Sequence, residues 1–369
     1  MDEPEMRRDP VAGRWVVIAP GRAARPLELA DAQPRCGPAS VVVCPFCEGA
    51  ERETPNEVYA LRAPGSAPNG PGWQLRVVPN MYPAVRQEEP NPPTPVPGRE
   101  GGAEVSSLAP PSLPGKGVGG LGSSAFSSLF LSAPAYGRAE VLIDCPAHID
   151  DPTQLSDAQM GEVFRAYRER LTALASDTRL AHVAIFKNVG AEAGASIAHT
   201  HSQLIALPVV PELIRTELNG AADHFARTGR CVFCELVERE LADGARVVAQ
   251  TANFVAVTAH APRFAYEMWV LPRGHEARYE SITDGAAREL AGLVKRVVRA
   301  LDTVRHAPAY NWFLHTSPLH AGEPAHYHWH LEVMPRTARP AGLEWGHGFH
   351  IVTVAPERAA SELRAALAG

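Results

Sequence analysis

Residues 197–204 read IAHTHSQL and place two histidines, His199 and His201, two positions apart, with Gln203 two positions further on. An apolar run, LIALP, follows Gln203 and predicts a β-strand. Because alternate residues of a strand point to the same face of a sheet, these three side chains are expected to line one side of an extended segment. The stretch therefore predicts two imidazoles and one amide acting on a single small region of space.

The two halves of the chain share one plan around such a stretch. In each half, a CxxC pair is followed by a strand ending in histidine, a long helix, a second strand and a histidine-bearing strand. In the first half these segments are CPFCE (44–48), AEVLIDCPAH (139–148), LSDAQMGEVFRAYRERLTALAS (155–176), VAIFKN (183–188) and HTHSQLIALP (199–208). In the second half they are CVFCE (231–235), AYEMWVLPRGH (265–275), SITDGAARELAGLVKRVVRALD (281–302), YNWFLHTSP (310–318) and HYHWHLEVMP (326–335).

We interpret this pattern as a duplicated α+β unit, in which each copy is an antiparallel sheet with one long helix packed against it. Both helical segments contain Ser or Thr followed by Asp, which is typical of a helix N-cap, and apolar residues recur every three or four positions. We place the first copy at residues 1–215 and the second at 216–369. Residues 87–124, rich in Pro, Gly and Ser, are expected to form a flexible insert, since such a composition buries little apolar surface.

The bulk composition is that of an ordinary folded domain or pair of domains. The 369 residues are 45% hydrophobic and 21% charged, with a formal net charge of −6. This mild negative charge gives no reason to expect a nucleic-acid or membrane partner. The sequence contains no apolar run long enough for a membrane helix, and its polar start, MDEPEMRRDP, does not resemble a signal peptide, so we expect a cytoplasmic protein.

Four of the six cysteines lie in the two CxxC pairs, and this spacing supplies two ligands of a tetrahedral zinc site. The predicted ligands of the first site are Cys44, Cys47, His148 and His199. Those of the second site are Cys231, Cys234, His275 and one of His326, His328 or His330. Matching the two histidine-bearing strands favours His330, and this match places Glu332 and Met334 where the first copy has His201 and Gln203. Four protein ligands leave no open coordination position, so both zinc ions are expected to be structural.

With His199 assigned to zinc, His201 remains available on a strand that the metal anchors. A neutral imidazole in such a position can attack an electrophile. The preceding loop offers hydrogen-bonding side chains and glycines that suit phosphate oxygens: Asn188, Gly190, Gly194 and Ser196. This combination favours transfer of a phosphoryl or nucleotidyl group over acyl transfer. Because the second copy lacks a comparable loop, and has Glu332 at the position matched with His201, we predict one active centre per chain.

Several stretches together resemble the galactose-1-phosphate uridylyltransferase family of the histidine-triad superfamily. They are RRDPVAGRWVVIAPGRAARP (7–26), CPFCEG (44–49), VVPNMYPAV (77–85), GRAEVLIDCPAH (137–148), FKNVGAEAGASIAHTHSQ (186–203) and HYHWHLEVMPR (326–336). The resemblance covers nearly the whole chain and implies a duplicated histidine-triad-like fold. It also implies a ping-pong reaction, in which His201 attacks a nucleotide sugar such as UDP-glucose, releases hexose 1-phosphate and passes the nucleotidyl group to galactose 1-phosphate, another sugar phosphate or phosphate.

The resemblance assigns roles to individual residues. Gln203 would contact the reacting phosphoryl group, and it stands where the hydrolase branches of the superfamily have a third histidine, which favours transfer over hydrolysis. The other implied substrate-binding residues, mostly phosphate contacts with one nucleoside-side asparagine, are Ser196, Asn188, Arg22, Arg25 and Asn80. Zinc at two sites, with iron as the alternative at one, and a homodimer are further implications.

Three departures from the best-known uridylyltransferases bear on which substrate is used. Thr200 replaces the proline between the two histidines, the second metal site has a CxxC pair, and the C-terminal stretch differs. These features are closer to relatives that use ADP-glucose and phosphate. An adenylyltransferase-type phosphorylase is therefore the alternative to a uridylyltransferase, ahead of a histidine-triad nucleotide hydrolase and of a non-enzymatic nucleotide-binding protein stabilised by zinc.

Overall fold

The computed structural model describes residues 4–21, 44–86 and 135–368. The predicted flexible insert 87–124 and the predicted phosphate-contacting residues Arg22 and Arg25 lie outside the described residues. None of the helices within the described ranges is long and apolar enough to cross a membrane.

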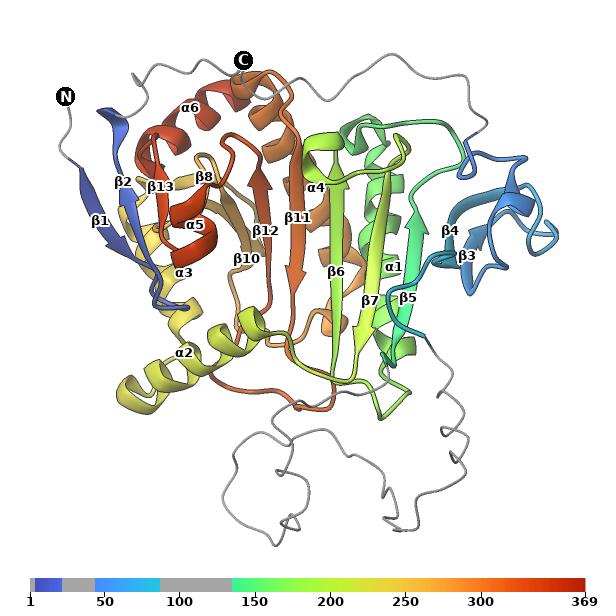
Figure 1. Cartoon of the computed structure of the whole chain (residues 1–369), viewed down its shortest axis with the longest axis horizontal. Helices are drawn as coiled ribbons and strands as arrows, with labels where there is room; N and C mark the ends of the chain where they lie inside the picture. The colour runs from blue at the N-terminus through green and yellow to red at the C-terminus, as the bar shows by residue number, and fades with distance from the viewer. Residues whose placement is uncertain (1–3, 22–43, 87–134, 369) are drawn as a thin grey trace, which may run out of the picture.

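Ten of the described strands form one sheet, and every neighbouring pair in it is antiparallel (Figure 1). In spatial order the strands are β3 (Tyr59–Arg62), β4 (Trp73–Pro79), β5 (Arg138–Ile143), β7 (His201–Leu207), β6 (His182–Val189), β11 (Tyr310–His315), β12 (His330–Pro335), β10 (Met268–Pro272), β9 (Phe254–Thr258) and β8 (Val247–Gln250). Runs such as VAIF in β6 and FVAVT in β9 carry β-branched and aromatic side chains, which pack well on a pleated surface.

The two copies of the predicted unit meet at the centre of this sheet. Strand β6 of the first copy pairs with β11 of the second, and Phe186 lies opposite Phe313. The order is mirrored about this pair, because β7 and β5 follow β6 as β12 and β10 follow β11. The predicted α+β class with antiparallel strands and packed helices is confirmed. The copies share one sheet instead of forming one each, and pairing β6 with β11 covers an edge strand of both copies.

One face of the sheet is covered by the two long helices that the sequence predicts, α1 (Asp157–Leu174) and α4 (Asp284–Arg305) (Figure 1). The side chains of Ser156 and Thr283 cap these helices by accepting hydrogen bonds from backbone N–H groups three residues later. Apolar residues of both helices pack with strand residues such as Leu204 to form the main core.

On the opposite face of the ten-stranded sheet, the covering elements lie mainly over the strands of the second copy. The covering elements are α2 (Glu212–Thr228), α3 (Val232–Asp243), α5 (Gly342–His347) and a small sheet of β1 (Glu5–Arg8), β2 (Trp15–Ile18) and β13 (His350–Val352) (Figure 1). Helix α6 (Pro356–Ala368) packs beside α4. The described 3-10 helices are short and span Glu51–Glu53, Pro152–Gln154, Ala191–Ala193 and Tyr279–Ser281. A second apolar cluster that includes Phe233 and Trp269 fills the space under α3. Among the described residues, the same face of the first copy carries a smaller cluster around Phe46.

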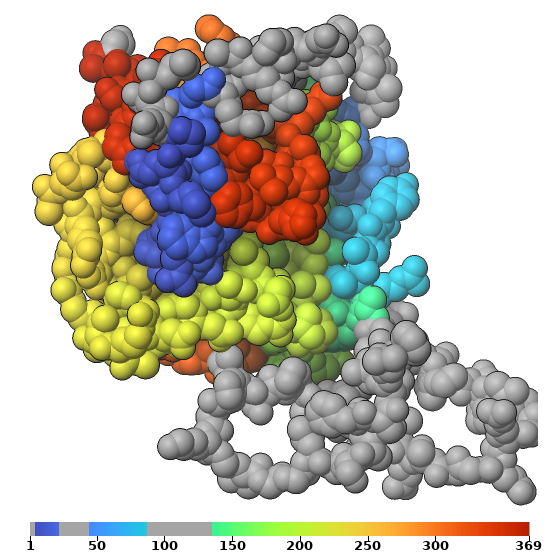
Figure 2. Space-filling view, turned by 60° about the vertical axis from the view of Figure 1, so that its left-hand side comes forward, coloured from blue at the N-terminus to red at the C-terminus, as the bar shows by residue number. Residues whose placement is uncertain are grey.

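The turn between β1 and β2 packs directly on α2. A Cβ atom on Gly220 would lie 1.9 Å from the carbonyl oxygen of Val11, so only glycine permits this approach. The Asp9 carboxylate fixes the turn, since it accepts the backbone N–H groups of Val11 and Ala12 and pairs with Arg14 at 3.0 Å. Figure 2 shows the N-terminal segment held between α2 and the C-terminal segment of the chain.

Candidate functional site

His201, the first residue of β7, has a ring whose orientation is fixed by the backbone. Its Nδ1 lies 2.7 Å from the carbonyl oxygen of His199, so Nδ1 carries the hydrogen and donates it. The lone pair of the neutral ring is therefore on Nε2. Burial lowers the pKa of His201, and the hydrogen bond to the His199 carbonyl opposes this shift only in part. The imidazole is consequently neutral near pH 7, which is the state required of a nucleophile.

The predicted residues Gln203 and Asn188 lie on the same face as His201. Gln203 is opposite Phe186 in the pairing of β7 with β6. The same register, continued by two residues, brings Asn188 beside His201. Gly194 is close to this pair, because a Cβ atom on it would lie 3.7 Å from Nδ2 of Asn188.

The loop between β6 and β7 depends on its two predicted glycines. Gly190 and Gly194 have φ angles of 86° and 90°, which lie in the region that favours glycine. They enclose the 3-10 helix Ala191–Ala193, and Ser196 follows, exposed to solvent. The backbone N–H groups of Ala193, Gly194 and Ala195 donate to carbonyl oxygens within the loop, so the exposed Ser196 hydroxyl is a group of this loop that can donate to an anion.

Asn311 of β11 supports this loop, and sequence reasoning missed this residue. Its Nδ2 donates to Oδ1 of Asn188 at 2.7 Å and to the carbonyl oxygen of Ala193 at 2.8 Å. Because the Asn188 oxygen is engaged, its NH₂ group is the part that can donate to a ligand. Only the pairing of Asn311 with Asn188 across β11 and β6 identifies this residue.

Asn80 lies further along the sheet. It follows β4, and its backbone N–H donates to Ala139 of β5, the residue that pairs with Ile205. Ile205 is four residues from His201 on β7, which corresponds to roughly 13 Å along an extended strand. A ligand that contacts both Asn80 and His201 must therefore extend along the sheet.

The four predicted ligands of the first metal site come together just before β7. The Cys47 sulfur lies 3.4 Å from Nδ1 of His148 and 3.7 Å from Nδ1 of His199, and the Cys44 sulfur lies 3.5 Å from the latter atom. Sulfur and nitrogen ligands of a tetrahedral zinc ion are roughly 3.5 Å apart, so these residues fit the ion. His199 Nε2 is 2.9 Å from the carbonyl oxygen of Cys145, a contact that leaves Nδ1 as the ligand atom.

The second group of ligands corrects the predicted assignment of His330. The residues whose ligand atoms all lie within 4.8 Å of one another are Cys231, Cys234, His275 and His328. The Cys234 sulfur is 3.4 Å from Nδ1 of His275 and 3.7 Å from Nδ1 of His328. His328 Nε2 lies 3.0 Å from the carbonyl oxygen of Pro272, which repeats the arrangement of His199 with Cys145. His328 is therefore the counterpart of His199.

His330, and not Glu332, is the counterpart of His201. Its Nδ1 lies 3.3 Å from the carbonyl oxygen of His328, and it begins β12 as His201 begins β7. Glu332 lies opposite Phe313, in the place that Gln203 has in the first copy. A shift of two residues keeps every side chain on the same face of a strand, so the alternating histidines alone did not fix the register. The second copy has thus kept a histidine at the position that corresponds to His201.

This correction leads to a prediction about metal binding. His328→Ala is expected to abolish binding at the second CxxC group, whereas His330→Ala is expected to retain it. In the cobalt-substituted protein, absorption from thiolate-to-metal charge transfer reports the occupied cysteine sites. About half of this absorption should disappear in His328→Ala, because one of two four-ligand sites is lost. An unchanged spectrum of His328→Ala, or an equal loss in His330→Ala, would contradict the assignment.

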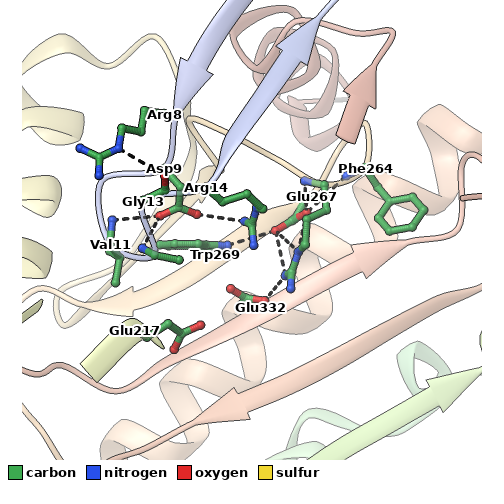
Figure 3. Close-up of polar contacts among 12 residues, drawn as sticks. Arg8, Asp9, Val11, Gly13, Arg14, Glu217, Phe264, Glu267, Trp269 and Glu332 are labelled. Carbon is green, nitrogen blue, oxygen red and sulfur yellow. Dashed lines mark hydrogen bonds and ion pairs between the residues drawn. The ribbon is translucent and has the colours of Figure 1, made fainter. Parts of the chain in front are cut away.

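A third group of titratable side chains includes His330, and sequence reasoning did not predict this group. Its members, with ligand atoms within 4.8 Å of one another, are Glu217, His315, His330 and Glu332. Arg263 pairs with Glu332 and lies 3.0 Å from Glu267, so a metal ion in this group would compete with a guanidinium for Glu332 (Figure 3). The His330 ring stacks on Trp269, with centroids 5.1 Å apart, and its exposed fraction is 0%. In the second copy, His330 is therefore enclosed, whereas its counterpart His201 lies beside an exposed loop.

A neutral imidazole beside a glycine-bounded loop, on a duplicated strand-and-helix unit, is the arrangement expected of a transferase that uses a histidine. Two family models match the chain. "Galactose-1-phosphate uridyl transferase, N-terminal domain" matches residues 115–211, and the C-terminal domain of the same family matches residues 217–363. An ADP-glucose phosphorylase from Arabidopsis thaliana is 32% identical, over 98% of this chain and 92% of its own length. The chain belongs to the galactose-1-phosphate uridylyltransferase family.

Other relatives agree with this placement. A galactose-1-phosphate uridylyltransferase from Haemophilus influenzae is 24% identical, over 99% of this chain and 95% of its own length. The crystal structure of an Arabidopsis thaliana ADP-glucose phosphorylase with bound ADP-glucose has a TM-score of 0.76 and 30% identity, with 98% of this chain and 99% of that chain covered. A uridylyltransferase structure has a TM-score of 0.71 and 26% identity, with 99% and 98% covered. This protein is therefore an enzyme of the nucleotidyltransferase class.

Proposed function

We propose that this enzyme transfers the nucleotidyl group of a nucleoside-diphosphate sugar through a covalent intermediate on Nε2 of His201. The observation that carries the proposal is the 2.7 Å hydrogen bond from Nδ1 of His201 to the His199 carbonyl, which leaves the lone pair on Nε2. The neighbouring loop supports a phosphorylated substrate, because the Asn188 NH₂ group and the exposed Ser196 hydroxyl can donate to phosphate oxygens.

The two half-reactions are balanced without a further reactant. First, Nε2 of His201 forms a bond to the α-phosphorus, and the bond from this phosphorus to the bridging oxygen breaks. The sugar 1-phosphate leaves with the electron pair, and the cationic ring keeps its Nδ1 hydrogen bonded to the His199 carbonyl. In the second step, an oxygen of phosphate or of a sugar phosphate attacks the same phosphorus. The Nε2 atom leaves with its electron pair, and the neutral imidazole is restored.

The surrounding residues would act by binding and orienting the phosphates, which is most of what such a reaction requires of a protein. In our proposal Gln203 contacts the reacting phosphoryl group, and Asn80 lies on the nucleoside side. The remaining proposed phosphate contacts are Asn188, Gly190, Gly194, Ser196, Arg22 and Arg25. The separation of Asn80 from His201, roughly 13 Å along the strand, suits an extended nucleotide.

We propose zinc at both CxxC groups, with iron as the alternative at one of them. Because four protein ligands close each site, the ion would stabilise the fold and would not activate water. At the first site it would also fix His199, whose carbonyl orients His201. A homodimer is proposed as well, from the family resemblance.

We favour ADP-glucose as the nucleotide sugar and phosphate as the acceptor. An ADP-glucose phosphorylase is 32% identical to this chain, against 24% for the Haemophilus influenzae uridylyltransferase. The CxxC pair of the second metal site and Thr200 between the histidines support the same choice. Transfer from UDP-glucose to galactose 1-phosphate is the second candidate, and the family models that match both halves of the chain support it.

Intact-mass measurement after incubation with each sugar nucleotide separately, without acceptor, tests the choice of substrate. We expect ADP-glucose to add one AMP to the protein with release of glucose 1-phosphate, and added phosphate to remove the AMP as ADP. Labelling by UDP-glucose alone would overturn the choice of ADP-glucose in favour of the second candidate. Continuous release of AMP without an acceptor would indicate a hydrolase, and the lack of any adduct would contradict the nucleotidyl-histidine.

A further inference from the structure

Asp144, Lys187 and Thr200 form a buried triad directly behind the strand that carries His201. Lys187 Nζ lies 2.5 Å from Oδ2 of Asp144 and 3.0 Å from Oγ1 of Thr200, and the Thr200 hydroxyl donates to the same Asp144 oxygen at 2.6 Å. The exposed fractions of the three residues are 1%, 1% and 4%. Lys187 Nζ also lies 5.3 Å from the centre of the Trp312 ring, which belongs to the main core. The triad therefore lies on the helix-covered side of the sheet, opposite His201.

The fold itself does not require this buried triad. In the second copy, the strand register places Leu314 where the first copy has Lys187, and Trp329 where it has Thr200, and equivalent strands form there. A buried ion pair costs desolvation energy that apolar side chains of similar size avoid. Asp144 Oδ1 is buried without a hydrogen-bond partner among the described residues, which an arrangement favoured for stability alone would not leave. These observations point to a role in the function of the first copy.

The peptide that joins His199 to Thr200 connects the triad to the nucleophile. The N–H of this peptide donates to the carbonyl oxygen of Ile149 at 2.6 Å, and its carbonyl accepts the Nδ1 hydrogen of His201 at 2.7 Å. The backbone N–H of Asp144 donates to the carbonyl oxygen of Thr200 at 3.2 Å. Because the triad holds the Thr200 side chain, it also holds the carbonyl that decides which nitrogen of His201 carries the hydrogen.

We propose that Asp144, Lys187 and Thr200 are positioning residues for nucleotidyl transfer. They hold the peptide before His201 so that the Nε2 lone pair is aimed at the α-phosphorus. This inference rests on the proposed function of His201. It also gives a reason for threonine between the two histidines, since its hydroxyl reaches both the lysine and the aspartate.

Thr200→Val tests the proposal, because valine keeps the shape of threonine and lacks its hydroxyl. We expect the rate of nucleotidyl-enzyme formation from ADP-glucose, measured by rapid quench, to fall about 10-fold or more, as for the loss of other groups that orient a functional histidine. The KM for ADP-glucose and the zinc content should stay at the values of the unmodified protein. Thr200→Ser, which restores the hydroxyl, should recover most of the rate. Lys187→Met, a change remote in sequence from every proposed metal ligand, should slow the same step.

Ser202→Ala is the matched control. It removes another buried hydroxyl two residues further along the chain, on the same side of the sheet, and this hydroxyl bonds to Tyr167 at 2.6 Å instead of to the triad. We expect a lower melting temperature without slower labelling. Labelling of Thr200→Val at the unmodified rate, or an equal slowing in Ser202→Ala, would overturn the positioning role. If neither ADP-glucose nor UDP-glucose labels the unmodified protein, the proposed function itself fails, so the two failures are distinguishable.

Discussion

Replacing His201 by alanine is expected to abolish the covalent nucleotidyl-enzyme and to lower turnover by at least about 10³-fold, a loss typical for removal of a nucleophile. The Nδ1 atom of His201 donates to the His199 carbonyl, so the lone pair of the ring is on Nε2 and points away from the backbone. Binding of the nucleotide sugar should persist, because the phosphate contacts are separate residues. The measurements are intact mass after incubation with ADP-glucose and the steady-state rate with phosphate.

His330→Ala is the matched control for this experiment. His330 has the same place in the second copy, but it is fully buried against Trp269 and beside Glu217 and Glu332. The variant is expected to melt at a lower temperature, since it leaves a cavity in a polar cluster, and yet to be labelled at the unmodified rate per folded molecule. Full labelling of His201→Ala, or loss of labelling in both variants, would contradict His201 as the nucleophile.

Disruption of the first metal site is expected to have the next largest effect. Cys47→Ser should lower the zinc content by about one ion per chain and slow labelling of His201 by about 100-fold, the upper range for loss of a group that orients a functional ligand. The reason is that His199 is a proposed ligand of this site and its carbonyl accepts the Nδ1 hydrogen of His201. Elemental analysis and the rate of adduct formation measure the two quantities on the same sample.

The equivalent change in the second copy separates the two metal sites. Cys234→Ser should also lower the zinc content by about one ion per chain and reduce the melting temperature, because structural zinc contributes directly to folding. Its site is connected to His328 and the enclosed His330, so labelling of His201 should remain near the unmodified rate. Equal slowing by Cys47→Ser and Cys234→Ser would show that both metal groups act only through global stability.

Local spacing explains what could be predicted from the sequence. The CxxC pairs, the capped helices of 155–176 and 281–302 and the alternating histidines each depend on neighbouring residues, and their repetition indicated a duplicated α+β unit. The first group of candidate ligands could be predicted because a single histidine, His199, stands two positions before the candidate nucleophile. The second could not, because His326, His328 and His330 alternate and a shift of two residues is invisible to the alternation.

The residues that the sequence did not indicate have partners far along the chain. Asn311 orients Asn188 across 123 positions, and Lys187 reaches Asp144 across 43. Such pairs form only when particular strands lie side by side, and a lone Asn or Lys in a strand carries no local pattern. The pairing of β6 with β11, which brings the two copies into one sheet, likewise depends on contacts between residues far apart in the chain.

The sequence by itself determined the class of fold and identified the first group of candidate metal ligands and the candidate nucleophile, since each is encoded in spacing over a few residues. Only the tertiary structure decided that His328 is the second copy's candidate ligand, that His330 is enclosed while His201 stands beside an exposed loop, and that a buried triad lies behind His201. The physical reason is that these features depend on strand register and on which face the helices cover, and both are set by contacts between residues distant in the chain.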